Sequence, residues 1–188
     1  MSTAVQTRPD VEPDRRSPTA DARVAVDGKF LRLGTARFLL KGVTYGTFAP
    51  DDQGYQFPDL GQVDRDFRQM AGLGINTVRV YTPPRRDLLD LASAHGLKVM
   101  VGIPWSQHVA FLDDRSLRRA IRRELAAFVR ELGDHPAAML FALGNEIPAG
   151  VIRWHGRLRV EHFLRSLYRS EEHTSELQSH LNLVCRLL

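Results

Sequence analysis

From Phe38 onward, short apolar runs alternate regularly with segments whose apolar residues recur at helical spacing. The runs are apolar on both faces, which is typical of parallel strands that are covered by helices. We expect these strands near residues 38–44, 76–81, 98–103 and 138–143. The helical stripes between them are Val63, Phe67, Met70 and Ala71, then Leu88, Leu91 and Ala92, then Leu117, Ile121, Leu125, Phe128 and Leu132. The alternation predicts an α/β fold of about four βα units.

Glycines stand where these helices should end, because glycine adopts the left-handed turn after a helix at little cost. They are Gly72, Gly74, Gly96 and Gly133. A fourth amphipathic helix is expected to start near Arg153, with an apolar face made of Val160, Phe163, Leu164 and Leu167. The turn residues and the periodicity therefore predict the same boundaries.

A short β-hairpin is expected ahead of the main fold. Asp27-Gly28 lies between the runs 23–26 and 29–33, and this dipeptide favours the tight turn of a hairpin. The segment 44–48 after the first predicted strand lacks the glycine-rich phosphate turn of a doubly wound sheet. A complete β/α barrel needs about 250 residues. We therefore expect the N-terminal half of a TIM (β/α)8 barrel.

Composition excludes several classes of protein. With 188 residues and 43% hydrophobic residues, the chain can bury one core. No apolar run approaches the roughly 20 residues that cross a bilayer, and Met1 to Asp21 lack the apolar stretch of a secretory signal. A cytoplasmic location is the default expectation. The single cysteine, Cys185, excludes an internal disulfide.

The net charge of +4 does not indicate nucleic acid, because the arginines are spread over several predicted helices without interleaved aromatic residues. No group of histidines and acids has metal-ligand spacing; His155 and His162 are seven apart on a predicted helix. We expect neither a metal nor a cofactor.

Three segments are expected along the chain. Residues 1–22 combine prolines with polar and charged residues, a composition that predicts a disordered leader. Residues 23–168 hold the partial barrel, and residues 169–188 form a separate tail.

Polar residues follow the end of the fourth predicted strand. The apolar run 137–143 is followed by Gly144, Asn145 and Glu146. In β/α barrels the reacting groups gather at the C-terminal ends of the strands. Glu146 is therefore the first candidate for an active-site acid, with an ordinary polar residue leaving a strand as the alternative.

Four motifs together resemble a known group. They are Asp27-Gly28-Lys29-Phe30, Leu40-Lys41-Gly42-Val43, Gly74-Ile75-Asn76-Thr77-Val78-Arg79 and Gly144-Asn145-Glu146. Over residues 24–168 the chain resembles the clan of retaining glycoside hydrolases with a β/α barrel, which includes the family two β-galactosidases and β-glucuronidases. The resemblance implies hydrolysis of O-glycosyl bonds in a β-linked glycan, with Glu146 as the general acid/base.

The resemblance also assigns roles to two other residues, and places after strand ends suggest two more. Asn145 matches the asparagine that binds the sugar 2-hydroxyl, or else it caps the strand end. Arg79 stands where the family holds an arginine against the nucleophile, or else it pairs with another acid. Tyr81 and Trp105 follow strand ends and either stack on a sugar or belong to the core. His108 is a weaker candidate for a hydroxyl contact.

In the complete clan fold the nucleophile is a second glutamate on the seventh strand. We expect this chain to be truncated before that strand and therefore to be inactive. The tail explains why: Arg169 to His180 resembles the translation of a sequencing adapter, and residues 181–188 resemble its usual continuation. The alternative is a genuine amphipathic helix through Leu177, Leu181, Val184 and Leu188.

Two other functions stay open. The chain could be a glycan-binding, hydrolase-like domain of a larger membrane glycosyltransferase or polysaccharide synthase. It could also be a lyase or aldolase that uses Lys98, although Lys98 begins its strand and so lies at the wrong end for barrel chemistry. A half barrel would expose the edges of its first and fourth strands, which predicts self-association.

Overall fold

The computed structural model describes residues 22–144, 146–172 and 183–184. The predicted leader, apart from Ala22, lies outside the described residues, as do Asn145, Cys185 and most of the adapter-like tail. Three helix positions proposed for the tail, Leu177, Leu181 and Leu188, also lie outside them.

The predicted hairpin is present and is extended by a third strand. Its antiparallel order is β1-β2-β3, with β1 at Val24–Asp27, β2 at Phe30–Leu33 and β3 at Ala36–Arg37. Gly28 (φ 60°) and Gly34 (φ 61°) make the two tight turns. The hairpin packs on the parallel sheet through Val24, which is buried against Met139 and Leu140.

A parallel sheet forms the centre of the molecule, in the order β4-β5-β6-β7-β8. Its strands are β4 Gly42–Thr44, β5 Thr77–Val80, β6 Lys98–Gly102, β7 Ala138–Ala142 and β8 Leu183–Val184. Each new strand joins the same side of the previous one, whereas a doubly wound sheet reverses direction. The fold is therefore α/β and corresponds to the first half of a β/α barrel, as the sequence predicted.

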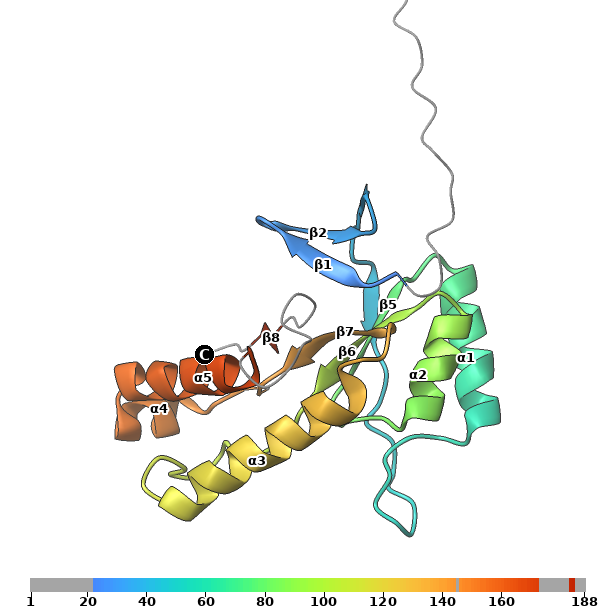
Figure 1. The fold of residues 1–188 in the computed structure, drawn as a ribbon. Coiled ribbons are helices and arrows are strands. Elements are labelled where there is room, and N and C mark those ends of the chain that lie inside the picture. The colour runs from blue at the N-terminus through green and yellow to red at the C-terminus, as the bar shows by residue number, and fades with distance from the viewer. Residues whose placement is uncertain (1–21, 145, 173–182, 185–188) are drawn as a thin grey trace, which may run out of the picture.

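Five helices connect and flank the strands in the described residues (Figure 1). They are α1 Leu60–Gly72, α2 Arg86–Ala94, α3 Arg115–Leu132, α4 Ala149–His155 and α5 Arg157–Glu172. Figure 1 shows α1 and α2 side by side on one flank of the strands, with β1 and β2 on the opposite side from α3.

The main core fills the space between these helices and the sheet. Most of the predicted stripes are buried in it, including Phe67 on α1, Leu88 on α2 and Leu125 on α3. On α3 the buried face is turned slightly from the prediction, because Val129 is buried while Phe128 is only half-buried at its margin.

The last predicted helix is divided into two. Gly156 has a φ of 81°, which ends α4 and lets the chain turn before α5 begins. The predicted apolar face, made of Val160, Phe163, Leu164 and Leu167, is buried as expected. Gly133 follows α3 as predicted, but its φ of −68° is right-handed rather than left-handed.

The two edges of the parallel sheet differ. The three residues of β4 are exposed, and in the part of the chain that the structure describes β4 pairs with β5 alone. The expectation of an unpaired fourth strand is corrected at β7, because Phe141 and Ala142 pair in parallel with Leu183 and Val184. That pairing involves the tail, for which no strand was predicted. None of the helices in the described residues is long and apolar enough to span a bilayer.

Candidate active site

A cavity of about 360 Å³ lies at the carboxyl ends of β5, β6 and β7. Side chains that take part in chemistry were expected at this end of the sheet. It is lined by Arg79, Tyr81, Thr82, Gly102, Ile103, Pro104, Trp105, Gln107, His108, Ala142 and Gly144. Three of the five predicted site residues, Arg79, Tyr81 and Trp105, are therefore brought together around one space.

Arg79 and Tyr81 form one wall. Arg79 lies on β5 and is half-buried, and its guanidinium carbon is 4.8 Å from the centre of the Tyr81 ring. This is a cation–π distance, so the aromatic ring holds the cation at the cavity. The main chain of Arg79 also accepts a hydrogen bond from the Tyr45 N–H at 2.8 Å, which extends the pairing of β4 with β5.

Trp105 is attached to the core and also lines the cavity. Its indole Nε1 donates to the main-chain oxygen of Leu143 at 2.5 Å, and its ring meets the ring of Phe111 edge-on at 4.9 Å. These contacts attach the indole to the core and to the end of β7. The side chain is only half-buried and lines the cavity. A ring fixed in this way presents a rigid surface to a ligand.

Glu146 lies in the loop between β7 and α4. Gly144, two residues before it, is buried and lines the cavity, and Ile147, directly after it, is fully buried. The side chain of Glu146 itself is exposed, and it is not among the residues that line the cavity. Glu146 therefore follows the cavity-lining Gly144 by two residues along the chain and directly precedes a buried residue. The position of Asn145 lies outside the described residues.

Gln107 and Thr82 line the cavity but were not predicted. Gln107 is 7% exposed, which is unusual for a glutamine, and its main-chain N–H donates to the Trp105 oxygen at 2.7 Å. Its amide can both donate and accept, so it suits a ligand that carries hydroxyl groups. The only signal in the sequence is its place two residues after Trp105. His108, the weaker candidate, is exposed and lines the same cavity.

Gly102 lets β5 and β6 come close together beneath this site. A Cβ atom at Gly102 would lie 2.8 Å from the main-chain oxygens of both Val80 and Tyr81. A side chain there would push the strand ends apart. Lys98 is buried at the opposite end of β6, and its ammonium group donates to the main-chain oxygens of Ala22 and Pro136.

Among the described residues, no group of three or more histidine, cysteine, aspartate and glutamate side chains could hold a metal ion.

No protein family and no curated protein sequence matches the chain. Solved structures of β-glucuronidases share its fold. The enzyme of Faecalibacterium prausnitzii superposes with a TM-score of 0.70 at 22% identity, over 87% of this chain and 28% of that chain. The enzyme of Parabacteroides merdae gives 0.67 at 22% identity, over 88% and 20%. The enzyme of Bifidobacterium dentium, solved with coumarin-3-O-glucuronide, gives 0.71 at 16% identity, over 87% and 26%. The chain spans 20–28% of the length of these proteins.

Proposed function

We propose that this chain is part of a glycoside hydrolase that cleaves β-linked O-glycosides with retention of configuration. The observation that carries the proposal is the cavity at the carboxyl ends of β5, β6 and β7, in a fold that is shared with β-glucuronidases. Because those similar structures are β-glucuronidases, β-glucuronides are the first substrates to test.

In this proposal the cavity binds a sugar ring. Tyr81 and Trp105 offer aromatic surfaces to the apolar C–H faces of the ring, and Gln107 offers an amide to its hydroxyl groups. Asn145 binds the 2-hydroxyl, a contact that strengthens as the transition state forms. Arg79 supplies a positive charge to the site, suited to the nucleophile carboxylate.

Glu146 acts as the general acid/base. As the glycosidic bond breaks, its carboxyl group gives a proton to the leaving oxygen, and its carboxylate then removes a proton from the attacking water. The support is its place in the loop that follows β7, two residues after the cavity-lining Gly144. A bound substrate would cover the side chain, which is exposed in the free protein.

A retaining hydrolase needs a second carboxyl group about 5–5.5 Å from the first. No acidic side chain lines the cavity in the part of the chain that the structure describes. We therefore expect the 188-residue chain to release no aryl group from aryl β-glucuronides or β-galactosides. Turnover that disappears in Glu146→Gln would refute this expectation.

The role of Glu146 can be tested in the protein obtained by sequencing the gene beyond the codon for Tyr168. If a later strand supplies a second glutamate, Glu146→Gln should retain most activity on a dinitrophenyl glycoside, whose leaving group needs no proton. The same variant should lose about 10²–10⁴-fold on a glycoside with a poor leaving group. An equal loss on both substrates would contradict the assignment.

A second candidate function is glycan binding without cleavage, as a domain of a larger membrane glycosyltransferase. The cavity favours it in one respect, since its described lining has aromatic rings and an arginine but no acid. A gene that continues into transmembrane helices and a transferase domain would select this function. A gene that continues into a second half barrel with a glutamate would select hydrolysis.

A further inference from the structure

A second and larger cavity lies between α3 and α5, with Phe163 among its lining residues. Its volume is about 460 Å³, within the range of small-molecule sites. Among the residues that the structure describes, its lining residues lie between Leu112 and Ser166. It is separate from the candidate active site, since the two share none of their described lining residues.

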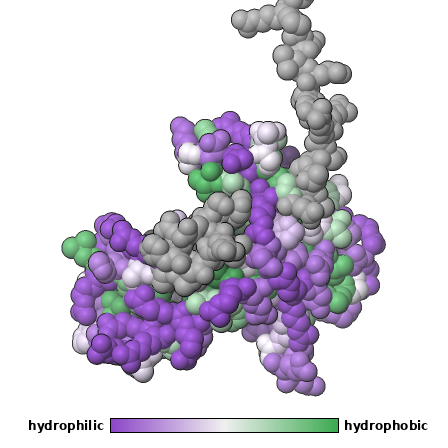
Figure 2. Space-filling view, in the orientation of Figure 1, coloured by the Kyte–Doolittle hydropathy of each residue, from purple (hydrophilic) through white to green (hydrophobic). Residues whose placement is uncertain are grey.

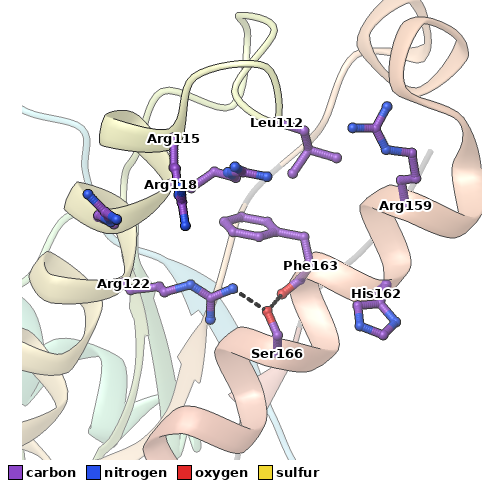
Figure 3. A pocket seen from close by; sticks show the side chains of 9 residues that line it. Leu112, Arg115, Arg118, Arg122, Arg159, His162, Phe163 and Ser166 are labelled. Atoms are coloured by element: carbon purple, nitrogen blue, oxygen red, sulfur yellow. Dashed lines mark hydrogen bonds between the residues drawn. The ribbon is translucent and has the colours of Figure 1, made fainter.

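Positively charged side chains dominate this cavity from both walls. Figure 3 shows Arg115, Arg118 and Arg122 coming from α3, and Arg159 and His162 coming from α5. Arg119 also lines it, so the described lining contains five arginines and no acidic side chain. The surface over α3 is correspondingly hydrophilic in Figure 2.

These arginines have no acidic partner among the described side chains. Within residues 22–144 and 146–169, no ion pair joins any of the five to a carboxylate. The contrast on α5 is clear: Glu161 pairs with Arg157 at 2.6 Å and approaches Arg165 at 4.0 Å, and neither arginine lines the cavity.

The acids at the start of α3 have other partners. Asp113 accepts a hydrogen bond from the Trp154 indole at 2.7 Å. Asp114 caps the helix by accepting from the N–H groups of Ser116 and Leu117 at 2.7 and 3.2 Å. The first N–H groups of α3 are thus already bonded, and a ligand in the cavity would meet arginine side chains instead.

One of the arginines, Arg122, is held in place before any ligand arrives. Arg122 is half-buried, donates to the Ser166 hydroxyl at 2.7 Å and lies 5.2 Å from the centre of the Phe163 ring. Arg118 is also half-buried. Arginines whose position is already restricted lose less entropy when they bind.

We propose that this cavity binds a ligand with two or more linked phosphate groups. A guanidinium group matches a phosphate with two parallel hydrogen bonds, and arginines in excess of acids attract an anion with several charges. Because the arginines stand on two helices, a ligand with linked phosphates can contact both walls at once. The inference goes beyond the proposed glycosidase function and does not rest on it.

The test is calorimetric titration of the full 188-residue chain with inorganic pyrophosphate, tripolyphosphate and orthophosphate at low ionic strength. We expect the first two to bind at least tenfold more tightly than orthophosphate. The double variant Arg118→Gln/Arg159→Gln removes one arginine from each wall. Its affinity for pyrophosphate should fall about tenfold or more per arginine.

The matched control is Arg123→Gln/Arg153→Gln, which removes the same charge from exposed arginines of α3 and α4 that do not line the cavity. We expect its affinity for pyrophosphate to stay within about twofold of that of the unaltered chain, because the removed charges lie outside the cavity and act on the ligand only at long range. Equal losses in both double variants would overturn the proposal, because net charge alone would then explain binding. A failure of pyrophosphate to bind the unaltered chain would overturn it as well.

Two further titrations identify the kind of contact and the class of ligand. Arg118→Lys keeps the charge but loses the paired hydrogen bonds, so its affinity should lie between those of the unaltered chain and Arg118→Gln. Equal affinity of Arg118→Lys and the unaltered chain would contradict the bidentate contact. ADP that binds as tightly as pyrophosphate would assign the site to nucleoside diphosphates, and weaker binding of ADP would assign it to inorganic polyphosphate.

Discussion

Replacing Gly102 by alanine should both destabilise the fold and disturb the candidate active site. The added Cβ would lie 2.8 Å from the main-chain oxygens of Val80 and Tyr81, and 2.9 Å from the Tyr81 carbonyl carbon. These atoms belong to the backbone of β5 and its end, so no side chain can rotate away to make room. The ends of β5 and β6 must separate, and the wall formed by Tyr81 moves with them.

The magnitude follows from overpacking. Inserting a methyl group into a close-packed interior costs typically about 1–3 kcal/mol, and a clash with backbone atoms belongs at the upper end. For a chain of 188 residues, 2–3 kcal/mol corresponds to a fall in melting temperature of about 4–12 °C. Urea denaturation followed by far-ultraviolet circular dichroism measures the free energy of unfolding directly.

Gly150→Ala is the matched control. It makes the same chemical change within α4, where nothing lies within 4 Å of the added Cβ. Alanine is the better helix former, so this variant should be neutral or more stable by up to about 1 kcal/mol. If Gly102→Ala proved as stable as the unaltered chain, the close approach of β5 and β6 at the cavity would be wrong.

Three further predictions concern groups outside the candidate active site. His155→Ala should lower the free energy of unfolding by about 2–4 kcal/mol in urea titrations. The buried ring accepts a hydrogen bond from the Leu112 N–H at 3.3 Å, so its loss leaves both a void and an unpaired donor. His162→Ala, at an exposed histidine, is the control, and equal effects of the two variants would contradict the role of the buried ring. The Ser116 hydroxyl, followed by main-chain N–H groups, lowers the pKa of Asp114. The stability lost in Asp114→Ala should therefore be evident at pH 7 and should shrink as the pH falls below about 4. A stability difference between the two proteins that grew at acid pH would refute the capping role of Asp114. Burial, followed by the hydrogen bond to Asp66, raises the pKa of Tyr45. The neutral hydroxyl therefore stabilises the fold below about pH 10, and this stabilisation is lost at higher pH. Thermal melts should show the unaltered chain losing stability relative to Tyr45→Phe above that pH, and parallel pH profiles of the two proteins would contradict this.

The parts of the fold that the sequence predicted well are those set by local periodicity. Strands that are buried on both faces and helices with one apolar stripe carry that pattern in every few residues, as β6 and α1 do. Asp27-Gly28 predicted the hairpin because the turn requires a positive φ at the glycine. Elements of two residues, such as β3 and β8, are too short to show either periodicity.

Elements of two or three residues carry too little pattern to be predicted. The expected strand at 38–44 is β4 at Gly42–Thr44 only, and β3 lies before it. The break at Gly156 interrupts a helical stripe that continues in α5, so the stripe alone predicted one helix. β8 depends on a partner far away in the sequence, which no local pattern reveals.

The candidate site was predicted in part for the same reason. Arg79, Tyr81 and Trp105 were found because each lies on or just after a strand, where a barrel gathers its side chains. Gln107 lies in a loop, and loops have no periodicity that separates a buried amide from an exposed one. The arginine cavity was missed because arginines spaced along α3 look like a solvated face until α5 packs opposite them.

Self-association through the exposed edge of β4 remains a prediction. Its three residues are exposed, and Val43 is 37% exposed. A strand edge of this kind pairs readily with another chain. Sedimentation velocity should show oligomers that decrease when Val43 is replaced by lysine, and an unchanged distribution would show that this edge is not the contact.

The central claim, that a β-linked sugar binds at the ends of β5, β6 and β7, can be measured through the two tryptophans of the chain. Trp105 lines the cavity, whereas Trp154 is 73% exposed on α4 and does not. Their indole N–H signals can be followed by nuclear magnetic resonance during titration with a phenyl β-glucuronide, with Trp154→Phe giving the assignment. We predict that the Trp105 signal shifts and saturates with a dissociation constant of about 1 mM or below, roughly −4 kcal/mol, while the Trp154 signal stays in place. A Trp105 signal that does not move across a panel of β-glycosides, or equal shifts of both signals, would contradict the account.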